Sequence, residues 1–106
     1  MELREEQGVL IFEKQADSFS EFISKVNNQS IALDKNVVLV VNESIDENNV
    51  SVFESFASKI KQNNQSIVIV APTTIGEEEQ SIAIVPTVQE ALDFIQMEEI
   101  ERDLGF

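Results

Sequence analysis

The stretch VVLVV at residues 37–41 and the stretch SIVIVA at residues 66–71 decide the fold of this chain. Both are short, continuous and rich in β-branched residues, a pattern typical of strands buried on both faces of a parallel sheet. The segment between them carries an apolar stripe at the helical spacing i, i+3, i+4, i+7, formed by Phe53, Phe56, Ala57 and Ile60. A strand, a helix and a second strand in this order predict a right-handed βαβ unit.

The N-terminal flank extends this unit. Residues 8–13 (GVLIFE) predict a first strand, and the segment after it carries a second helical stripe. Ser18 and Glu21 stand at the spacing of a capping box at the start of that helix. The stripe consists of Phe19, Phe22, Ile23 and Val26.

The C-terminal flank adds residues 81–85 (SIAIV) as a fourth strand, and the pair Thr87 and Glu90 opens a final helix. Residues 72–80 between the third and fourth strands predict a loop or a single helical turn. The sequence therefore predicts one α/β domain with a four-stranded, mostly parallel sheet in the order β-α-β-α-β-β-α. We expect the helices to pack mainly on one face, so that an N-terminal extension, the tail or another chain must cover the other.

Composition restricts the function. Twenty acidic residues against seven basic ones give a net charge of −13, which repels nucleic acid and anionic membranes. The chain has no histidine and no cysteine, and therefore lacks the commonest general base, the thiol nucleophile and the usual transition-metal ligands. No glycine-rich phosphate motif occurs. We expect a cytoplasmic protein that is not an enzyme and needs no cofactor.

An acidic metal site is a weaker alternative. Glu43, Asp46 and Glu47 follow a predicted buried strand together with Asn48 and Asn49, and ligands of open α/β sheets bind at the carboxyl ends of strands. The spacing matches no EF-hand loop. Helix capping by Asp46 or Asn48 is the simpler interpretation, and we therefore predict no metal site.

Two phrases carry a family resemblance. Residues 45–50 (IDENNV) follow a buried strand, and residues 87–92 (TVQEAL) open the last helix. Together with the element order, they resemble the STAS family of anti-sigma-factor antagonists, in which the corresponding phrases take the forms Ile-Asp-Ser-Ser-Gly-Leu and Val-x-x-Glu-Ala-Leu. The resemblance implies a regulatory protein-binding domain of bacteria whose partner is a kinase-like or sigma-regulatory protein.

The sequence also departs from that family. The serine that the partner kinase phosphorylates in the family falls at Glu47 or Asn48 here, and neither residue has a hydroxyl group. Ser44 and Ser51 are the nearby hydroxyls, and Ser44 with Glu47 also has the spacing of a capping box. The link between the third and fourth strands is shorter than in the family. We therefore expect a degenerate member without phosphorylation at the usual serine.

The final helix carries two apolar stripes. At about 100° per residue, Val88, Ala91, Leu92 and Ile95 share one side, whereas Met97, Ile100 and Leu104 lie roughly opposite. One straight helix cannot bury both stripes against one sheet. Either residues 97–106 form a tail that folds back over the uncovered sheet face, or they dock onto a partner or a second copy of the chain.

These observations predict a non-enzymatic protein–protein interaction module over residues 1–106, with residues 97–106 as its C-terminal tail. An accessory protein that acts through homo-oligomerisation, as a homodimer, is the alternative, and the acidic metal-binding domain is the weaker one. The residues expected to bind the partner are Ser44, Asp46, Glu47, Asn48, Ser51, Met97, Ile100, Leu104 and Phe106.

Overall fold

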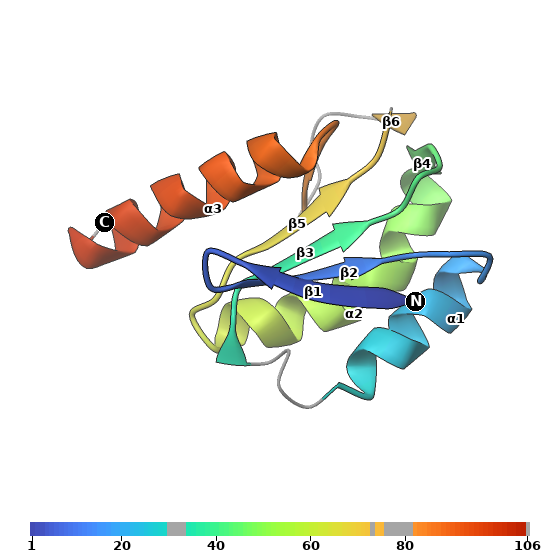
Figure 1. Ribbon diagram of the computed structural model, residues 1–106, viewed down its shortest axis with the longest axis horizontal. Coiled ribbons are helices and arrows are strands. Elements are labelled where there is room, and N and C mark those ends of the chain that lie inside the picture. Colours follow the sequence, from blue (N-terminus) through green and yellow to red (C-terminus); the bar gives the residue numbers. More distant parts are fainter. Residues whose placement is uncertain (30–33, 73, 76–81, 106) are drawn as a thin grey trace.

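The computed structural model of the chain describes residues 1–29, 34–72, 74–75 and 82–105, with only the backbone described at 46–48 and 74–75. The described part is an α/β arrangement of a five-stranded mixed sheet and three helices (Figure 1). The strands of the sheet lie in the order β1-β2-β3-β5-β7, and all neighbours are parallel except β1 and β2. The predicted α/β class is confirmed, and the main sheet has one strand more than predicted, β1.

The central βαβ unit forms as predicted. Strand β3 (Val37–Val40) pairs in parallel with β5 (Ile67–Val70), with Val38 opposite Val68. Helix α2 (Glu47–Gln62) connects them, and its predicted apolar stripe is buried against the sheet. Every residue of both strands is buried, which explains why their sequences are continuous apolar runs without alternation.

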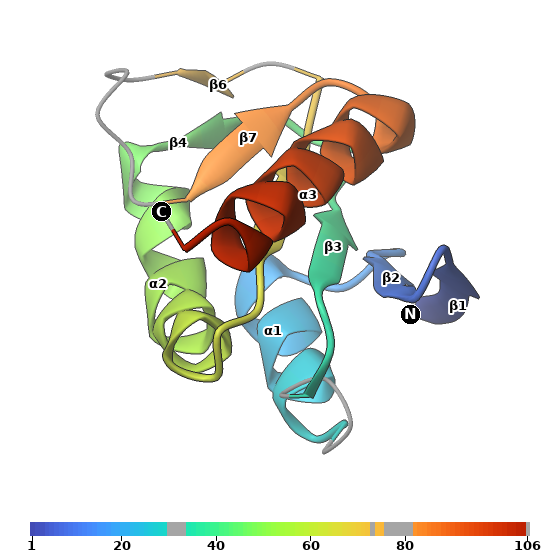
Figure 2. The same ribbon diagram turned by 90° about the vertical axis from the view of Figure 1, so that its left-hand side faces the viewer.

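Helices cover both faces of the sheet, which corrects the prediction that they pack mainly on one face. Helix α1 (Phe19–Asn27) and α2 lie on one side, and α3 (Val88–Asp103) crosses the other (Figures 1 and 2). Right-handed crossovers between sequential parallel strands hold α1 and α2 on the same side. Because α3 follows β7 (Ala83–Val85), the last strand of the sheet, no crossover restricts its side.

The side that α3 takes is set by the apolar surface left uncovered there. Two separate clusters of buried side chains lie on the two sheet faces. The larger one packs under α1 and α2. The smaller one joins the first half of α3 to alternate residues of the strands: Val9, Ile11, Val38, Val40, Val68, Val70, Ala91, Leu92 and Ile95.

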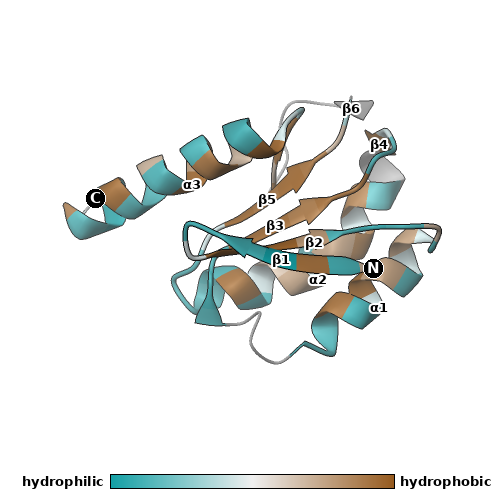
Figure 3. Cartoon of the chain, viewed as in Figure 1, coloured by the Kyte–Doolittle hydropathy of each residue, from teal (hydrophilic) through white to brown (hydrophobic). Residues whose placement is uncertain are grey.

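Strand β1 (Glu2–Glu6) is the strand of the main sheet that the sequence did not predict. It pairs antiparallel with β2 (Val9–Glu13) through a two-residue turn in which Gln7 and Gly8 have φ of 54° and 79°. Positive φ at both positions is the geometry of a type I′ hairpin turn, which glycine favours. All five residues of β1 are exposed, and their charges suit an edge strand that must not pair with other chains (Figure 3).

Two further short strands form outside the main sheet. Residues Ile45–Asp46 (β4) and Thr74–Ile75 (β6) pair in parallel. Strand β6 lies within residues 72–80, which were predicted as a loop or helical turn, and the rest of that stretch beyond Pro72 lies outside the described residues. In the described part of the chain, no helix is long and apolar enough to cross a bilayer.

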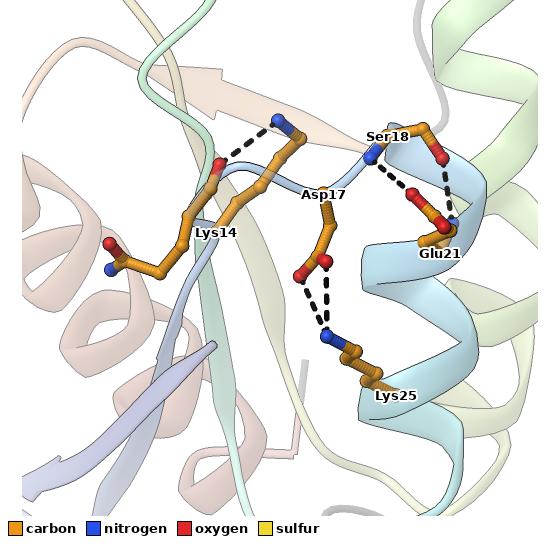
Figure 4. A network of polar contacts seen from close by, with 6 residues as sticks. Lys14, Asp17, Ser18, Glu21 and Lys25 are labelled. Carbon is orange, nitrogen blue, oxygen red and sulfur yellow. Dashed lines mark hydrogen bonds and ion pairs between the residues drawn. The ribbon is translucent and has the colours of Figure 1, made fainter.

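The two predicted helix starts are observed. Ser18 caps α1: its side chain accepts a hydrogen bond from the Glu21 backbone N–H, and the Glu21 carboxylate accepts one from the Ser18 N–H (Figure 4). The side chain of Thr87 accepts a hydrogen bond from the Glu90 N–H at 3.1 Å at the start of α3. Both side chains satisfy backbone donors that have no partner inside the helix.

Candidate functional site

Two polar residues stand directly before the central parallel strands, at the amino edge of the sheet. Asn36 precedes β3 and Ser66 precedes β5, and they are 4% and 2% exposed. The side-chain oxygen of Asn36 accepts a hydrogen bond from the Ser66 backbone N–H at 2.7 Å. A buried donor and a buried acceptor thus satisfy each other, as buried polar groups must.

The C-terminal half of α3 closes over this pair. Asn36 donates through Nδ2 to the Glu99 carboxylate at 2.9 Å. The Ser66 hydroxyl donates to Glu98 at 2.5 Å and accepts from the Arg102 guanidinium at 2.9 Å. We call these five residues the clamp. The clamp holds the second half of α3 to the sheet edge by hydrogen bonds, whereas apolar packing holds the first half to the sheet face.

The clamp is better suited to positioning than to catalysis. A serine hydroxyl beside a carboxylate has the elements of a nucleophile and its base. Here the Arg102 guanidinium donates to the Ser66 oxygen, and the hydroxyl is almost fully buried. One of the two lone pairs of the Ser66 oxygen is therefore engaged by Arg102, and burial shields the hydroxyl from substrates. We assign the clamp a structural role.

A groove of about 410 Å³ opens beside the clamp, between the second half of α3, the α2–β5 loop and the start of β7. Phe94 and Ala83 form apolar parts of its wall, and Lys61, Glu98 and Arg102 are its charged residues. Charges of both signs therefore line it. This mixed lining does not indicate one chemical class of small ligand.

The opposite side of α3 carries exposed apolar side chains. Met97, Ile100 and Leu104 are 64%, 52% and 64% exposed, and α3 continues through Met97 to Asp103 without interruption. We call these three residues the outer stripe. The described part of the tail therefore does not fold its apolar side chains back over the sheet, and the first half of α3 covers that face instead. Phe106, also predicted to bind a partner, lies outside the described residues.

The other predicted site residues lie at the carboxyl edge of the sheet. Ser44 is exposed just before β4, and Ser51 is exposed on α2. Asp46, Glu47 and Asn48 are placed at the end of β4 and the first turn of α2, and their side chains lie outside the description. Helix α2 begins at Glu47, three residues after Ser44. The predicted Ser44–Glu47 capping box involves a side chain outside the described residues and stays a prediction.

A buried lysine supports this carboxyl-edge loop. Lys14 follows β2, its side chain is 4% exposed, and its Nζ forms an ion pair with Glu43. The ammonium group also lies 5.3 Å from the centre of the Phe19 ring and donates a hydrogen bond to the Gln15 carbonyl at 3.4 Å. A buried charge is stable only when paired and hydrogen-bonded, so this arrangement ties the end of β2 to the segment that precedes Ser44.

The two predicted sets of partner-binding residues do not meet. Figure 1 shows β4 and the start of α2 at one end of the molecule and the end of α3 at the other. A single small partner cannot contact both. The structure therefore offers two separate candidate surfaces, the carboxyl-edge loop and the outer stripe.

Metal binding gains no support from the side chains that are described. Among them, no three histidine, cysteine, aspartate or glutamate residues converge on a point that could hold an ion. The side chains of Asp46 and Glu47, on which the metal alternative depends, lie outside the described residues. A smaller groove of about 250 Å³ near this edge is lined by Asn42, Val70, Ala71, Pro72 and Pro86, and none of these five described residues has an ionisable side chain.

Comparisons with known proteins return no match: no family model, no curated protein and no solved structure is similar to this chain. The candidate site must therefore be judged on its own geometry. Sequence reasoning missed Asn36, Ser66 and Lys14 because single polar residues beside strands are common. Their one signal is position, since each adjoins an end of a buried strand, where its backbone is fixed.

Proposed function

We propose that this chain is a non-enzymatic protein–protein interaction module of the bacterial cytoplasm, and that the outer stripe of α3 is its docking surface. The observation that supports this most is the exposure of three large apolar side chains on one face of a helix whose other face is clamped to the sheet. Fully burying such a side chain is worth about 1.5–3 kcal/mol. Binding of a partner that covered the stripe would gain free energy from burial of all three side chains.

The clamp strengthens the proposal. A helix held only by apolar packing could rotate to bury Met97 or Leu104, but rotation of α3 would break the hydrogen bonds of Asn36 and Ser66. Those groups are buried, and leaving one unsatisfied costs about 1–3 kcal/mol. The clamp thus keeps the stripe facing outward without a partner.

The kinship with anti-sigma-factor antagonists is part of this proposal and depends on residues 45–50 and 87–92. In that family a partner kinase phosphorylates a serine at the position of Glu47 or Asn48, which would place Ser44 and Ser51 in a second contact. The end-to-end separation of the two surfaces (Figure 1) suits two partners better than one. We rank the outer stripe first because its exposed apolar residues are described, whereas three side chains of the loop are not.

The test is a variant with Met97→Ser, Ile100→Ser and Leu104→Ser. Because all three side chains are exposed, we expect its thermal unfolding to stay close to that of the unmodified chain. When the triple variant is used as bait for cross-linking and capture from the source cell, the partner recovered with the unmodified chain should be absent. Leu3→Ser is the control, since Leu3 is also a large exposed apolar residue, 42% exposed, but lies on β1. Unchanged partner recovery with the triple variant would refute the proposal.

A further inference from the structure

The charged side chains beside the outer stripe on α3 are all acidic. Taking about 100° per residue, Met97, Ile100 and Leu104 fall within an arc of about 60°. Exposed Glu90, Asp93 and Glu101 lie within about 40° of Met97 on the same projection. The outer face of α3 therefore carries three carboxylates on the side of Met97: Asp93 and Glu101 lie about one turn from it, and Glu90 lies about two turns before it.

No basic side chain balances these carboxylates on the helix. Arg102 is the one basic residue of α3, and its guanidinium donates to the Ser66 hydroxyl in the clamp. It therefore projects toward the sheet edge, away from the stripe. The whole chain, at a net charge of −13, adds to the negative field around this face.

This charge pattern selects among partners. In a symmetric dimer, the same patch of each copy faces the other, so three carboxylates of one copy would approach three of its mate. Like charges brought together across an interface are costly. Resting on the proposed function, we infer that the occupant of the outer stripe is an amphipathic helix of a different protein, with lysine or arginine residues flanking its apolar face.

The size of the stripe indicates the kind of complex. From residue 97 to residue 104 a helix rises only about 10 Å, whereas a stable interface buries about 800 Å² on each partner. Contact through this stripe is therefore weak and transient, and depends on attraction between opposite charges. Such attraction accelerates association and falls with ionic strength.

The experiment uses the full chain and two synthetic helical peptides with the same leucine stripe. One peptide carries lysines beside the stripe and the other carries glutamates. We expect calorimetry at low salt to show binding of the lysine peptide alone, weakening as salt is added. The triple serine variant should lose this binding. Binding of the glutamate peptide with equal affinity, or unchanged binding of the lysine peptide by the triple variant, would overturn the inference.

A charge reversal gives a matched comparison. Glu101→Lys on α3 should weaken binding of the lysine peptide by roughly threefold to tenfold, whereas Glu54→Lys, at an exposed position of α2, should change it much less. Equal effects of the two reversals would show that only the overall charge matters, against the inference.

The failure of this inference can be told apart from the failure of the proposed function. A dimer in sedimentation that the triple serine variant abolishes would mean that a second copy occupies the stripe, which overturns the inference and leaves a docking surface. Absence of lysine-peptide binding together with unchanged partner capture by the triple variant would overturn both.

Discussion

The two halves of α3 attach to the same sheet by different means. In the first half, Ala91, Leu92 and Ile95 are buried on alternate valines and isoleucines of the strands. In the second half, charged side chains reach Asn36 and Ser66 through hydrogen bonds. Apolar packing supplies most of the free energy of folding but little direction, whereas hydrogen bonds are directional. The first half of α3 therefore stabilises the helix on the sheet, and the second half sets its orientation.

The largest effect should come from the first half. Ile95→Ala removes a side chain that is 1% exposed and should lower the free energy of unfolding by about 2–5 kcal/mol. Met97→Ala, two residues further on the same helix and 64% exposed, should change it by less than about 0.5 kcal/mol. Denaturant titration measures both. Similar losses in the two variants would show that the outer stripe is packed and would contradict the division of α3.

A smaller effect is expected from the clamp. Asn36→Ala removes the acceptor of the buried Ser66 N–H and the donor to Glu99, and should cost about 1–3 kcal/mol. Hydrogen exchange should become faster in the second half of α3 than in the first. Gln89→Ala is the control, because it removes an exposed hydrogen bond to Asp93 on the same helix. Uniformly faster exchange along α3 would mean that the clamp does not act on one half alone.

The N-cap of α3 should matter less. Thr87→Ala removes the hydroxyl that accepts from the Glu90 N–H, and the expected loss in the free energy of unfolding is about 1 kcal/mol. Thr87→Ser keeps the acceptor and should restore most of it. Thermal unfolding monitored by circular dichroism measures the series. If serine were no better than alanine, the hydroxyl would not be the stabilising group.

The smallest expected effect is a pH-dependent contribution of the α1 cap to stability, which the α3 cap should lack. The pKa of Glu21 is lowered from its ordinary 4.5, first by the hydrogen bond from the Ser18 backbone N–H. A lowered pKa in the folded state gives stability that is present above the ordinary value and is lost as the pH falls through the lowered one. We therefore expect the difference in thermal unfolding midpoint between the unmodified chain and Glu21→Gln to shrink toward zero as the pH is lowered. Thermal unfolding at a series of pH values measures it.

The matched comparison for this titration is the cap of α3. The hydroxyl of Thr87 does not titrate in this range, so the effect of Thr87→Ala should not shrink over the same pH interval. Nearby, the pKa of Asp17 is also lowered from its ordinary 3.8, first by the hydrogen bond from Lys25, and Asp17→Asn should behave like Glu21→Gln. A midpoint difference for Glu21→Gln that is independent of pH would contradict the assigned cause.

The sequence pattern predicted the central elements because burial on both faces leaves continuous apolar runs. Short apolar runs such as residues 37–41 and 66–71 are typical of strands buried on both faces of a sheet. The spacing of Phe53 and Ile60 indicates the helix between them. The sequence pattern did not predict β1, which consists of four charged residues and one leucine. An edge strand exposed on all residues leaves no alternation to detect. Gly8, which the prediction placed in the first strand, lies in the hairpin turn instead.

The candidate site was predicted in part. The two stripes of α3 follow from helical spacing, and the exposure of Met97, Ile100 and Leu104 agrees with the expectation that they lie opposite the sheet. The clamp could not be predicted, because Asn36 and Glu99 are 63 positions apart and meet only in the folded sheet. The side of the sheet that α3 covers was also undetermined, since handedness rules apply to helices between strands.

The place of α3 after the last strand has a consequence for chains that are cut short. The sheet face with Val38, Val68 and Ile11 is covered by α3 and by no other helix among the described residues. A chain that stopped before Val88 would keep both βαβ units but present this face to water. Such a patch attracts other chains. Premature termination or proteolysis near Pro86 would therefore expose an apolar surface that promotes aggregation or chaperone binding.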